Sequence, residues 1–276
     1  MSVVEVAFLG PRGTYSHLVA EKRFGSRSRL IPLPTIQDVC QHVARSRDAR
    51  GIVPIENSSG GAILETVDIL LANRPRVFIE EELSLQVTLA LIGRRNERPR
   101  VLYSHFAPLE HCSPWIRKHL PKVEKKVVVS TAVGALWAAA ETGSVALGSR
   151  HLARMYGLDI LHYPVEADVP NLTSFLVIAG RQQPTSRPIK TTLSVRIPNT
   201  PGSLCTFLDQ FRKRDVNLSR IVSRPIRGSP REYAFLVDIE GGTADANVRR
   251  ALADVRKVSI YLRVAGSYPC RAAYQS

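Results

Sequence analysis

Two hydroxyl side chains, Thr173 and Ser174, stand directly before the apolar run FLVIA, residues 175–179, which Gly180 ends. A continuous apolar run of this length is typical of a β-strand that is buried on both faces. Hydroxyls at the start of such a strand lie at an edge of the sheet, where α/β folds bind small ligands. The pair could therefore donate hydrogen bonds to a ligand, although threonine is also common at an ordinary strand start.

A glycine turn, GPRGTYS at residues 10–16, is a second candidate site. It follows a strand predicted over residues 4–9 and precedes a helix predicted to end at Phe24. The free amides at a helix start, with the helix dipole behind them, favour an anion. The turn therefore predicts a site for a carboxylate or phosphate, although it matches neither a dinucleotide fingerprint nor a P-loop.

The stretch IENSSGG, residues 55–61, repeats this layout. It follows a strand that is predicted to end at Val53-Pro54, and it precedes an amphipathic helix predicted over residues 63–71. Asn57 and Ser58 are good helix caps, which would be a purely structural role. A charged Glu56 beside them at a strand end is less easily explained by packing.

The elements that must position these residues alternate along the chain. Strands are predicted over residues 83–93, 100–105 and 144–149, and helices over 131–141 and 152–156. This alternation predicts an α/β sheet with parallel pairs over residues 1–180. Residues 181–190 are polar and contain proline, which indicates a linker. Residues 191–270 then have the order βαββαβ, the ferredoxin-like arrangement, which alone fixes no function.

Composition excludes some classes of protein. The 276 residues are 44% hydrophobic, which is enough for two folded domains. The net charge of +14 would suit nucleic acid, but the basic residues are scattered, and no aromatic residues alternate with their densest cluster, residues 94–100. We therefore predict no nucleic-acid partner, and a basic surface that at most attracts an anionic metabolite.

The chain shows no membrane or export signal by its composition. Its start lacks a basic region ahead of the apolar residues, so a strand is predicted there rather than a signal peptide. No apolar segment reaches the roughly 18 residues of a membrane span, so we predict no membrane association. The cysteines are far apart and lack metal-binding spacing: Cys40, Cys112, Cys205 and Cys270. Reduced thiols in the cytoplasm are the simplest interpretation.

Five motifs occur in an order that resembles one known family. They are VAFLGPRGTYSH, IVPIENSSGGAI, SRHLARMYGLDIL, DVPNLTSFLVI, and PGSL with SRP. Together they resemble prephenate dehydratase followed by an ACT regulatory domain, over nearly the whole chain. The resemblance implies two α/β lobes built like a type II periplasmic binding protein, with the active site between them. It also implies a homodimer or homotetramer that binds L-phenylalanine at its ACT domains as an inhibitor, and it implies no metal and no organic cofactor.

The family's reaction explains the residue types. Prephenate, a dianion, loses carbon dioxide and its ring hydroxyl together and becomes phenylpyruvate, so the enzyme needs a proton donor for the departing oxygen. By position in the motif, the resemblance gives this catalytic role to Thr173. It places other residues against the substrate, with Glu56 in a positioning role: Thr14, Ser16, Glu56, Asn57, Ser58, Thr131, Ser174 and Phe175. It places these at the phenylalanine site: Asn199, Pro201, Gly202, Ser203, Leu204, Ser223, Arg224 and Pro225.

Several positions depart from the family's motifs. Ser174 replaces an arginine and Val222 replaces a glutamate, while Gln86 and Thr88 lie where the family has an LPIHH strand and Val133 where it has a glutamate. If the arginine pairs a substrate carboxylate, restoring it at position 174 should lower the KM for prephenate. Two other readings stay open, a prephenate decarboxylase with a non-aromatic product and a non-catalytic amino-acid sensor. Arogenate also remains open as the substrate.

Overall fold

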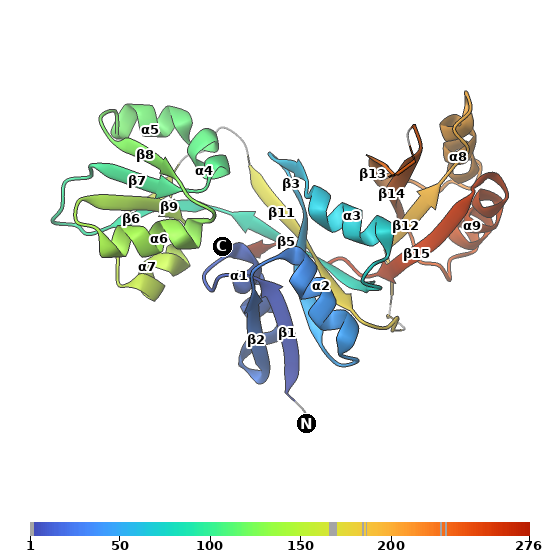
Figure 1. Ribbon diagram of the computed structural model, residues 1–276, viewed down its shortest axis with the longest axis horizontal. Helices are drawn as coiled ribbons and strands as arrows, with labels where there is room; N and C mark the ends of the chain where they lie inside the picture. The colour runs from blue at the N-terminus through green and yellow to red at the C-terminus, as the bar shows by residue number, and fades with distance from the viewer. Residues whose placement is uncertain (1–2, 166–169, 184, 186, 227, 230) are drawn as a thin grey trace.

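The computed structural model describes residues 3–276 except 166–169, 184, 186, 227 and 230. These residues form three sheets, which lie side by side along the long axis of the molecule (Figure 1). The central sheet and one flanking sheet make two α/β lobes, and the third sheet belongs to a C-terminal βαββαβ unit. The α/β class predicted from the alternating pattern is confirmed.

The first lobe contains the central sheet, with the strand order β16-β5-β11-β3-β1-β2 and β4 beside β3. β1 is parallel to β2 and β3, whereas β11 is antiparallel to both β3 and β5. Its strands are β1 (Val4–Leu9), β2 (Ser28–Leu33), β3 (Arg50–Asn57), β4 (Gly61–Ala62), β5 (Phe78–Val87), β11 (Asn171–Ala179) and β16 (Tyr274–Gln275). Its helices are α1 (Tyr15–Phe24), η1 (Gly25–Arg27), α2 (Ile36–Arg45) and α3 (Leu64–Ala72).

The second lobe has the strand order β10-β6-β9-β7-β8, with β7 parallel to β8 and β9. Its strands are β6 (Leu89–Gly93), β7 (Val101–Ser104), β8 (Glu124–Val127), β9 (Ser144–Gly148) and β10 (Asp159–Val165). Its helices are α4 (Phe106–His111), α5 (Ser113–His119), α6 (Thr131–Ala140) and α7 (Arg150–Tyr156). The chain crosses between the lobes twice, from β5 to β6 and from β10 to β11.

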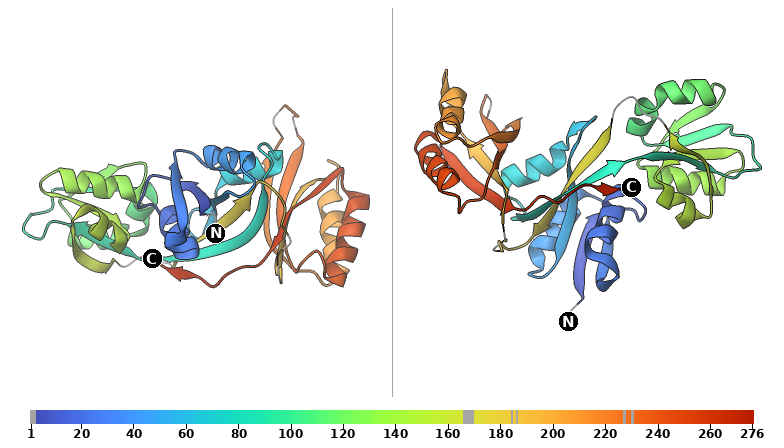
Figure 2. Two further views of the ribbon diagram at one scale, coloured as in Figure 1. Left: turned by 90° about the horizontal axis from the view of Figure 1, so that it is seen from below. Right: turned by 180° about the vertical axis from the view of Figure 1, so that it is seen from behind.

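The C-terminal unit has the strand order β13-β14-β12-β15, with antiparallel neighbours, as the ferredoxin-like arrangement requires. Its elements are β12 (Lys190–Arg196), α8 (Ser203–Arg212), β13 (Leu218–Pro225), β14 (Tyr233–Glu240), α9 (Ala246–Val258) and β15 (Tyr261–Tyr268). Its two helices cover the outer face of the sheet, away from the lobes (Figure 2). The inner face packs on the first lobe, where Leu236, Ala265 and Tyr268 join a core with Leu70 and Ile79.

The strand predicted over residues 83–93 is wrong in two respects. It is two strands in different sheets, because the chain passes from one lobe to the other at Thr88. β5 also begins earlier than predicted, at Phe78, and it includes three glutamates. Those charges lie in a strand because distant cations pair them: Arg50 binds Glu80, Arg23 and Arg271 bind Glu81, and Lys190 binds Glu82.

Two helices begin beyond the polar residues that precede them. α8 begins at Ser203, with Gly202 as its N-cap at φ 82°, so Asn199 and Pro201 lie outside the helix. Asn57 and Ser58 are not helix caps, because β4 intervenes and α3 begins only at Leu64. Both segments therefore leave polar side chains outside the helices, where they can make other contacts.

Residues 269–276 run back from the C-terminal unit along the first lobe (Figure 2). Pro269 accepts a hydrogen bond from the Glu82 amide, and β16 adds to the edge of β5 with Tyr274 opposite Leu85. The Ser276 hydroxyl contacts both the amide and the carbonyl of Thr88, at the crossing between the lobes. The final segment therefore ties the C-terminal unit to the crossing strand.

Candidate functional site

Thr173 lies at one edge of the central sheet, opposite Asn57 in the pairing of β11 with β3. Because β1 and β3 are parallel and β11 is antiparallel to β3, β1 and β3 end on the side of the sheet where β11 starts, although β3 extends beyond β1: Phe8 pairs with Ile52, whereas Asn57 pairs with Thr173. The turn at residues 10–16 follows β1 there. The structure therefore places the other two predicted polar segments, residues 10–16 and 55–61, after strands that end on the side of the sheet that carries Thr173, as expected for a ligand site in an α/β fold.

Asn57 is the centre of a hydrogen-bond network at this edge. Its Nδ2 donates to Asn171 Oδ1 at 2.7 Å and to Thr173 Oγ1 at 2.8 Å. Its Oδ1 accepts from the Ser59 and Gly60 amides, both at 3.0 Å, and from the Ser59 hydroxyl at 2.5 Å. The amide is thus fixed at both of its polar atoms, and it holds Thr173 Oγ1 in one position.

The proton of the Thr173 hydroxyl remains available. A hydroxyl has one donor and two acceptor positions, and here the oxygen uses an acceptor position for Asn57. Among the residues that the structure describes, none accepts the Thr173 proton, and the side chain is only partly buried. Thr173 can therefore donate a hydrogen bond to a ligand at the sheet edge.

Ser58 links the end of β3 to the start of β11 by hydrogen bonds. Its amide donates to the Leu172 carbonyl at 2.8 Å, and its hydroxyl accepts from the Leu172 amide at 2.9 Å and donates to the Pro170 carbonyl at 3.0 Å. These bonds engage the hydroxyl that was expected to bind substrate. Ser58 therefore fixes the strand that carries Thr173, and Asn171 and Ser59 join the network although the sequence did not single them out.

The glycine turn is less open than predicted. The Thr14 hydroxyl donates to the Leu9 carbonyl at 2.9 Å and accepts from the His17 amide at 3.3 Å, so it caps α1. The Gly13 amide donates to His17 Nδ1 at 3.0 Å. In the described turn and helix start, the amides left for an anion are those of Arg12 and of Tyr15 and Ser16, the first two residues of the helix.

The turn lies at the boundary between the lobes. A side chain at Gly13 would meet Leu152 and Met155 of α7 and Ala132 of α6, all in the second lobe. Thr131 begins α6 and precedes Ala132 in the chain, so it also lies near the turn. Ser16 and Thr131 are 4% and 6% exposed, so both side chains are buried at or near this boundary.

A cluster of His17, Glu21 and His151 also joins the lobes, and its ligand atoms lie within 4.8 Å of one another. His17 Nδ1 accepts the Gly13 amide, so the neutral ring carries its proton on Nε2, which faces Glu21 at 3.5 Å. Burial lowers the pKa of His17, against the opposing effect of Glu21, which agrees with a neutral ring. Among the described residues, neither His17 Nε2 nor His151 Nε2 has a hydrogen-bond partner, and the two atoms lie 3.5 and 3.8 Å from the Glu21 carboxylate, so the cluster is a close polar contact between α1 and α7.

Three residues expected to touch the substrate lie elsewhere. Phe175 is 1% exposed and belongs to the core with Phe8 and Leu85, so it presents no surface to a ligand. Ser174 follows Thr173 in a strand and therefore points to the opposite face, where it pairs with Glu56 and Ser84. The sequence predicts a strand that starts at Phe175, whereas β11 begins at Asn171, so Thr173 and Ser174 lie within the strand and on opposite faces of it.

Glu56 also faces away from Thr173. The pairing of β3 with β11 shifts between Ser174 and Phe175, so that β3 carries one extra residue there, a β-bulge. The Glu56 carboxylate accepts from Arg220 of the C-terminal unit, at 2.8 Å from Nε and 2.7 Å from Nη2. Arg220 is a residue that the sequence alone did not single out.

The residues expected at an effector site gather at one end of the C-terminal sheet. Arg224 pairs with Ala234, and Ala234 pairs with Arg196, so the end of β13 and the loop after β12 lie at the same end. Most of that loop is exposed, including Asn199, Pro201 and Gly202. Ser223 and Pro225 are exposed too, whereas Arg224 turns inward and binds Asp68 of α3 at 2.6 and 2.8 Å.

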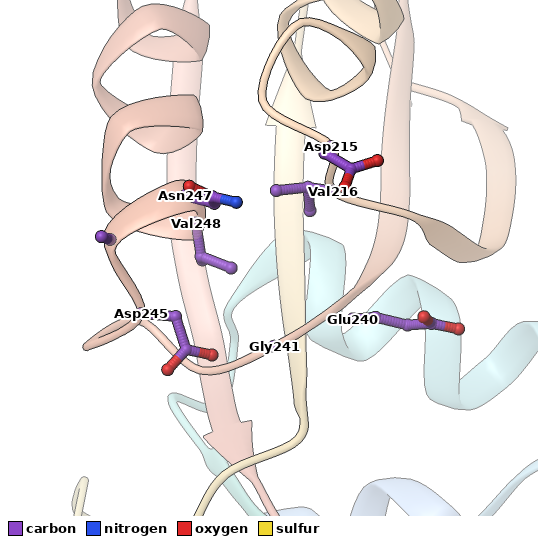
Figure 3. Close-up of a pocket in the computed structure, with 8 residues that line it drawn as sticks. Asp215, Val216, Glu240, Gly241, Asp245, Asn247 and Val248 are labelled. Carbon is purple, nitrogen blue, oxygen red and sulfur yellow. The ribbon is translucent and has the colours of Figure 1, made fainter.

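A hollow of about 520 Å³ opens at the other end of the C-terminal unit (Figure 3). It lies near the start of β13 and the end of β14, and three of its residues carry carboxylates: Asp215, Glu240 and Asp245. It contains none of the residues expected to bind phenylalanine. In the described part of the chain, no helix is both long and apolar enough to cross a membrane.

Comparison with known proteins identifies both parts of the chain. The family model described as prephenate dehydratase matches residues 6–183, and the ACT domain model matches residues 191–257. Over 268 residues, the chain is 34% identical to the bifunctional chorismate mutase/prephenate dehydratase of Aquifex aeolicus. That match covers 96% of this chain and 74% of the relative.

Two solved structures are similar to this chain over nearly its whole length. The crystal structure of prephenate dehydratase from Arthrobacter aurescens in complex with L-Phe has a TM-score of 0.86 at 29% identity, covering 96% of this chain and 90% of that chain. GqqA, described as a novel type of quorum quenching acylase, also has a TM-score of 0.86, at 26% identity, and the match covers 97% and 98% of the two chains.

Proposed function

The chain belongs to the prephenate dehydratase family, and on this premise we propose that it converts prephenate to phenylpyruvate as a carbon-oxygen lyase of L-phenylalanine biosynthesis. The observation that carries the proposal is the Thr173 hydroxyl, which Asn57 holds at 2.8 Å while its proton stays available. A donor of this kind is what the departing ring hydroxyl requires.

In the proposed mechanism, Thr173 donates a hydrogen bond to the ring hydroxyl as it leaves. The electron pair of the breaking carbon–carboxylate bond moves into the ring, and carbon dioxide is released. The carbon–oxygen bond breaks with its own electron pair, the departing oxygen takes the Thr173 proton and leaves as water, solvent returns a proton to Thr173, and the ring becomes aromatic. Asn57 keeps Thr173 Oγ1 in place through the step, so little reorganisation is needed. A positioned donor of this type typically contributes about 100- to 10,000-fold in rate.

The substrate's two carboxylates need neutral or positive groups around them. The amides of Tyr15 and Ser16 begin α1, where the helix dipole favours an anion. Ser16 and Thr131 add hydroxyls at or near the lobe boundary. The Glu56 carboxylate faces Arg220 and therefore adds no negative charge to the site, which suits the binding of a dianion.

Regulation follows the same premise. We propose that L-phenylalanine binds at the exposed end of the ACT sheet, at the loop around Gly202 together with Ser223, and that the enzyme works as a homodimer or homotetramer. The Arthrobacter aurescens relative with bound L-Phe supports an effector of this chemistry. The exposure of the loop leaves room for a ligand between two ACT surfaces.

The ultraviolet spectrum after incubation with prephenate tests the proposed reaction. Enolic phenylpyruvate, which absorbs in alkali, is the expected product. A non-aromatic product would instead identify a decarboxylase, and unchanged prephenate would favour the interpretation as a non-catalytic amino-acid sensor. Parallel incubation with arogenate distinguishes the substrates, because dehydration of arogenate yields phenylalanine directly.

A further inference from the structure

Glu56 and Asn57 are neighbours in the chain but serve opposite faces of the central sheet. The bulge between β3 and β11 turns Glu56 toward the ACT domain and leaves Asn57 opposite Thr173. Asn57 holds the Thr173 hydroxyl, and Glu56 is held by Arg220 of β13. A single peptide unit therefore separates a contact with the regulatory domain from a contact with the proposed proton donor.

Arg220 is built into the interface rather than placed on its surface. It is 8% exposed, and besides Glu56 it donates to Asp238, which is fully buried, and lies 3.9 Å from Glu82. Burial by itself would lower the pKa of Arg220, but Asp238, Glu82 and Glu56 raise it, so the guanidinium stays charged. A planar guanidinium can bridge two carboxylates at once, and here it bridges one from each domain.

The neighbouring interface contact makes a useful comparison. Arg224 lies four residues further along β13 and binds Asp68 of α3 with two hydrogen bonds, at 2.6 and 2.8 Å. The Glu56 and Asp68 side chains are equally exposed, at 43% and 42%. Both pairs join the same two domains, but only Glu56 is adjacent in the chain to a residue that contacts Thr173.

From this geometry we propose that Arg220 of the ACT domain is a positioning residue for the dehydratase site, acting through Glu56 on the Asn57 amide that holds Thr173. The inference rests on the proposed function. It means that a movement of β13 reaches the proton donor through one ion pair and one hydrogen-bonded amide. An error of about 1 Å in the position of a reacting group can lower a rate about 100-fold, so a small displacement of β3 would be enough to affect turnover.

The test compares Glu56→Gln with Asp68→Asn in the full chain. Each change removes one carboxylate charge from an arginine–carboxylate pair of the interface, and the two carboxylates are equally exposed. We expect Glu56→Gln to lower kcat about tenfold with KM for prephenate within threefold, and Asp68→Asn to change kcat less than twofold, while both shift the melting temperature alike. Equal effects of the two variants on kcat, or an unchanged kcat in Glu56→Gln, would overturn the inference.

Two further variants exclude a general loss of structure. Removing Arg220 altogether would leave the buried Asp238 without the guanidinium that binds it, which would destabilise the fold. Arg220→Lys keeps a charge for Asp238 but loses the planar guanidinium, whose Nε and Nη2 bind Glu56 while Nη1 binds Asp238, so it should lower kcat as Glu56→Gln does. In an Asn57→Ala background, Glu56→Gln should add less than a twofold effect, because the path through Asn57 is already broken. A full tenfold effect in that background would contradict the proposed path.

The same assay separates failure of the inference from failure of the proposed function. A wild-type protein that leaves prephenate unchanged overturns the proposed function and this inference with it. A wild-type protein that turns prephenate over, with Glu56→Gln and Asp68→Asn indistinguishable, overturns the inference alone.

Discussion

The Thr173 edge of the central sheet and the Gly202 end of the ACT sheet are built in opposite ways. At the first, five hydrogen bonds fix both polar atoms of Asn57, and Ser58 ties the adjoining strands together. At the second, the loop from Asn199 to Gly202 is exposed, and α8 starts from a glycine with φ 82°. The Thr173 edge, our proposed catalytic end, is held by hydrogen bonds within the chain, whereas the Gly202 end, our proposed effector end, is left exposed for a ligand or another surface to complete.

This difference follows from the two tasks. A rate depends on groups that already hold the geometry of the transition state, so freedom at Thr173 would slow turnover. An effector site must instead respond to a ligand, and a ligand changes an equilibrium only if the site differs between the free and bound states. Variants at the two ends should therefore separate turnover from regulation.

The largest expected effect is at the organised end. Thr173→Val keeps the shape of the side chain and removes the hydroxyl, so kcat should fall about 100-fold or more through loss of the proton donor. Thr173→Ser keeps a hydroxyl and should retain most of the rate. Steady-state kinetics with prephenate, and thermal unfolding of each variant, are the measurements. A stable Thr173→Val protein with near-normal turnover would remove Thr173 from the mechanism.

At the exposed end, Gly202→Ala should weaken L-phenylalanine binding about fivefold and leave kcat unchanged. A residue with a side chain costs about 1 kcal/mol or more at φ 82°. Nothing lies within 4 Å of the added methyl, so this cost comes from the backbone conformation of the loop and not from a clash. Titration calorimetry of the full chain with L-phenylalanine measures the affinity.

Gly157→Ala is the matched control for Gly202→Ala. Gly157 ends α7 at φ 66°, also with open space around a Cβ, but it lies in the second lobe. It should lower the melting temperature to a similar extent and leave the phenylalanine affinity unchanged. If both variants weakened binding equally, the effect would come from stability, and the exposed loop would lose its special role.

A smaller effect is expected at Ser174, and here the structure reverses the expectation from the sequence. Arginine at this position was expected to lower KM by pairing a substrate carboxylate. Ser174 faces away from Thr173 and pairs with Glu56 in the sheet, so Ser174→Arg would meet Glu56 and Arg220 instead. We therefore expect the KM for prephenate to stay within about threefold of wild type, since directly opposite residues in a sheet are close neighbours. A tenfold decrease in KM would show that position 174 reaches the substrate.

The sequence was most informative where local pattern decides the structure. The apolar alternation of VEVAFL predicts β1 at residues 4–9 correctly, and the βαββαβ order of the ACT domain is likewise readable from its apolar runs. Thr173 could be placed at a sheet edge for the same reason. Because neighbouring residues of a strand alternate between faces, the separation of Thr173 from Ser174 could also have been predicted, had the strand been started at Asn171.

The rest depended on contacts between distant residues. Glu80, Glu81 and Glu82 do not suggest a buried strand until cations from elsewhere in the chain are placed beside them. Nothing local in IENSSGG indicates the bulge that turns Glu56 toward Arg220, which is 164 residues away in the chain. The hydrogen-bonded organisation of the Thr173 edge is therefore a tertiary property, although its residues are visible in the sequence.

The smallest expected effect concerns His17 and tests whether the lobe boundary is held as firmly by hydrogen bonds as the Thr173 edge is. Burial lowers the pKa of His17 from 6.5, Glu21 opposes the shift, and Arg12 and His151 add to it. In the unfolded chain His17 gains a proton below about pH 6.5, while the folded protein keeps it neutral, so the unfolded state binds more protons and stability falls as the pH decreases through that range.

His17→Gln, which keeps an acceptor for the Gly13 amide, should remove this dependence. Urea unfolding at pH 7 and pH 5.5 should therefore show the wild type losing up to about 1 kcal/mol more stability than the variant. Equal losses would mean that His17 is protonated in the folded protein too, which would break its bond from Gly13 and show that the boundary is looser than the Thr173 edge.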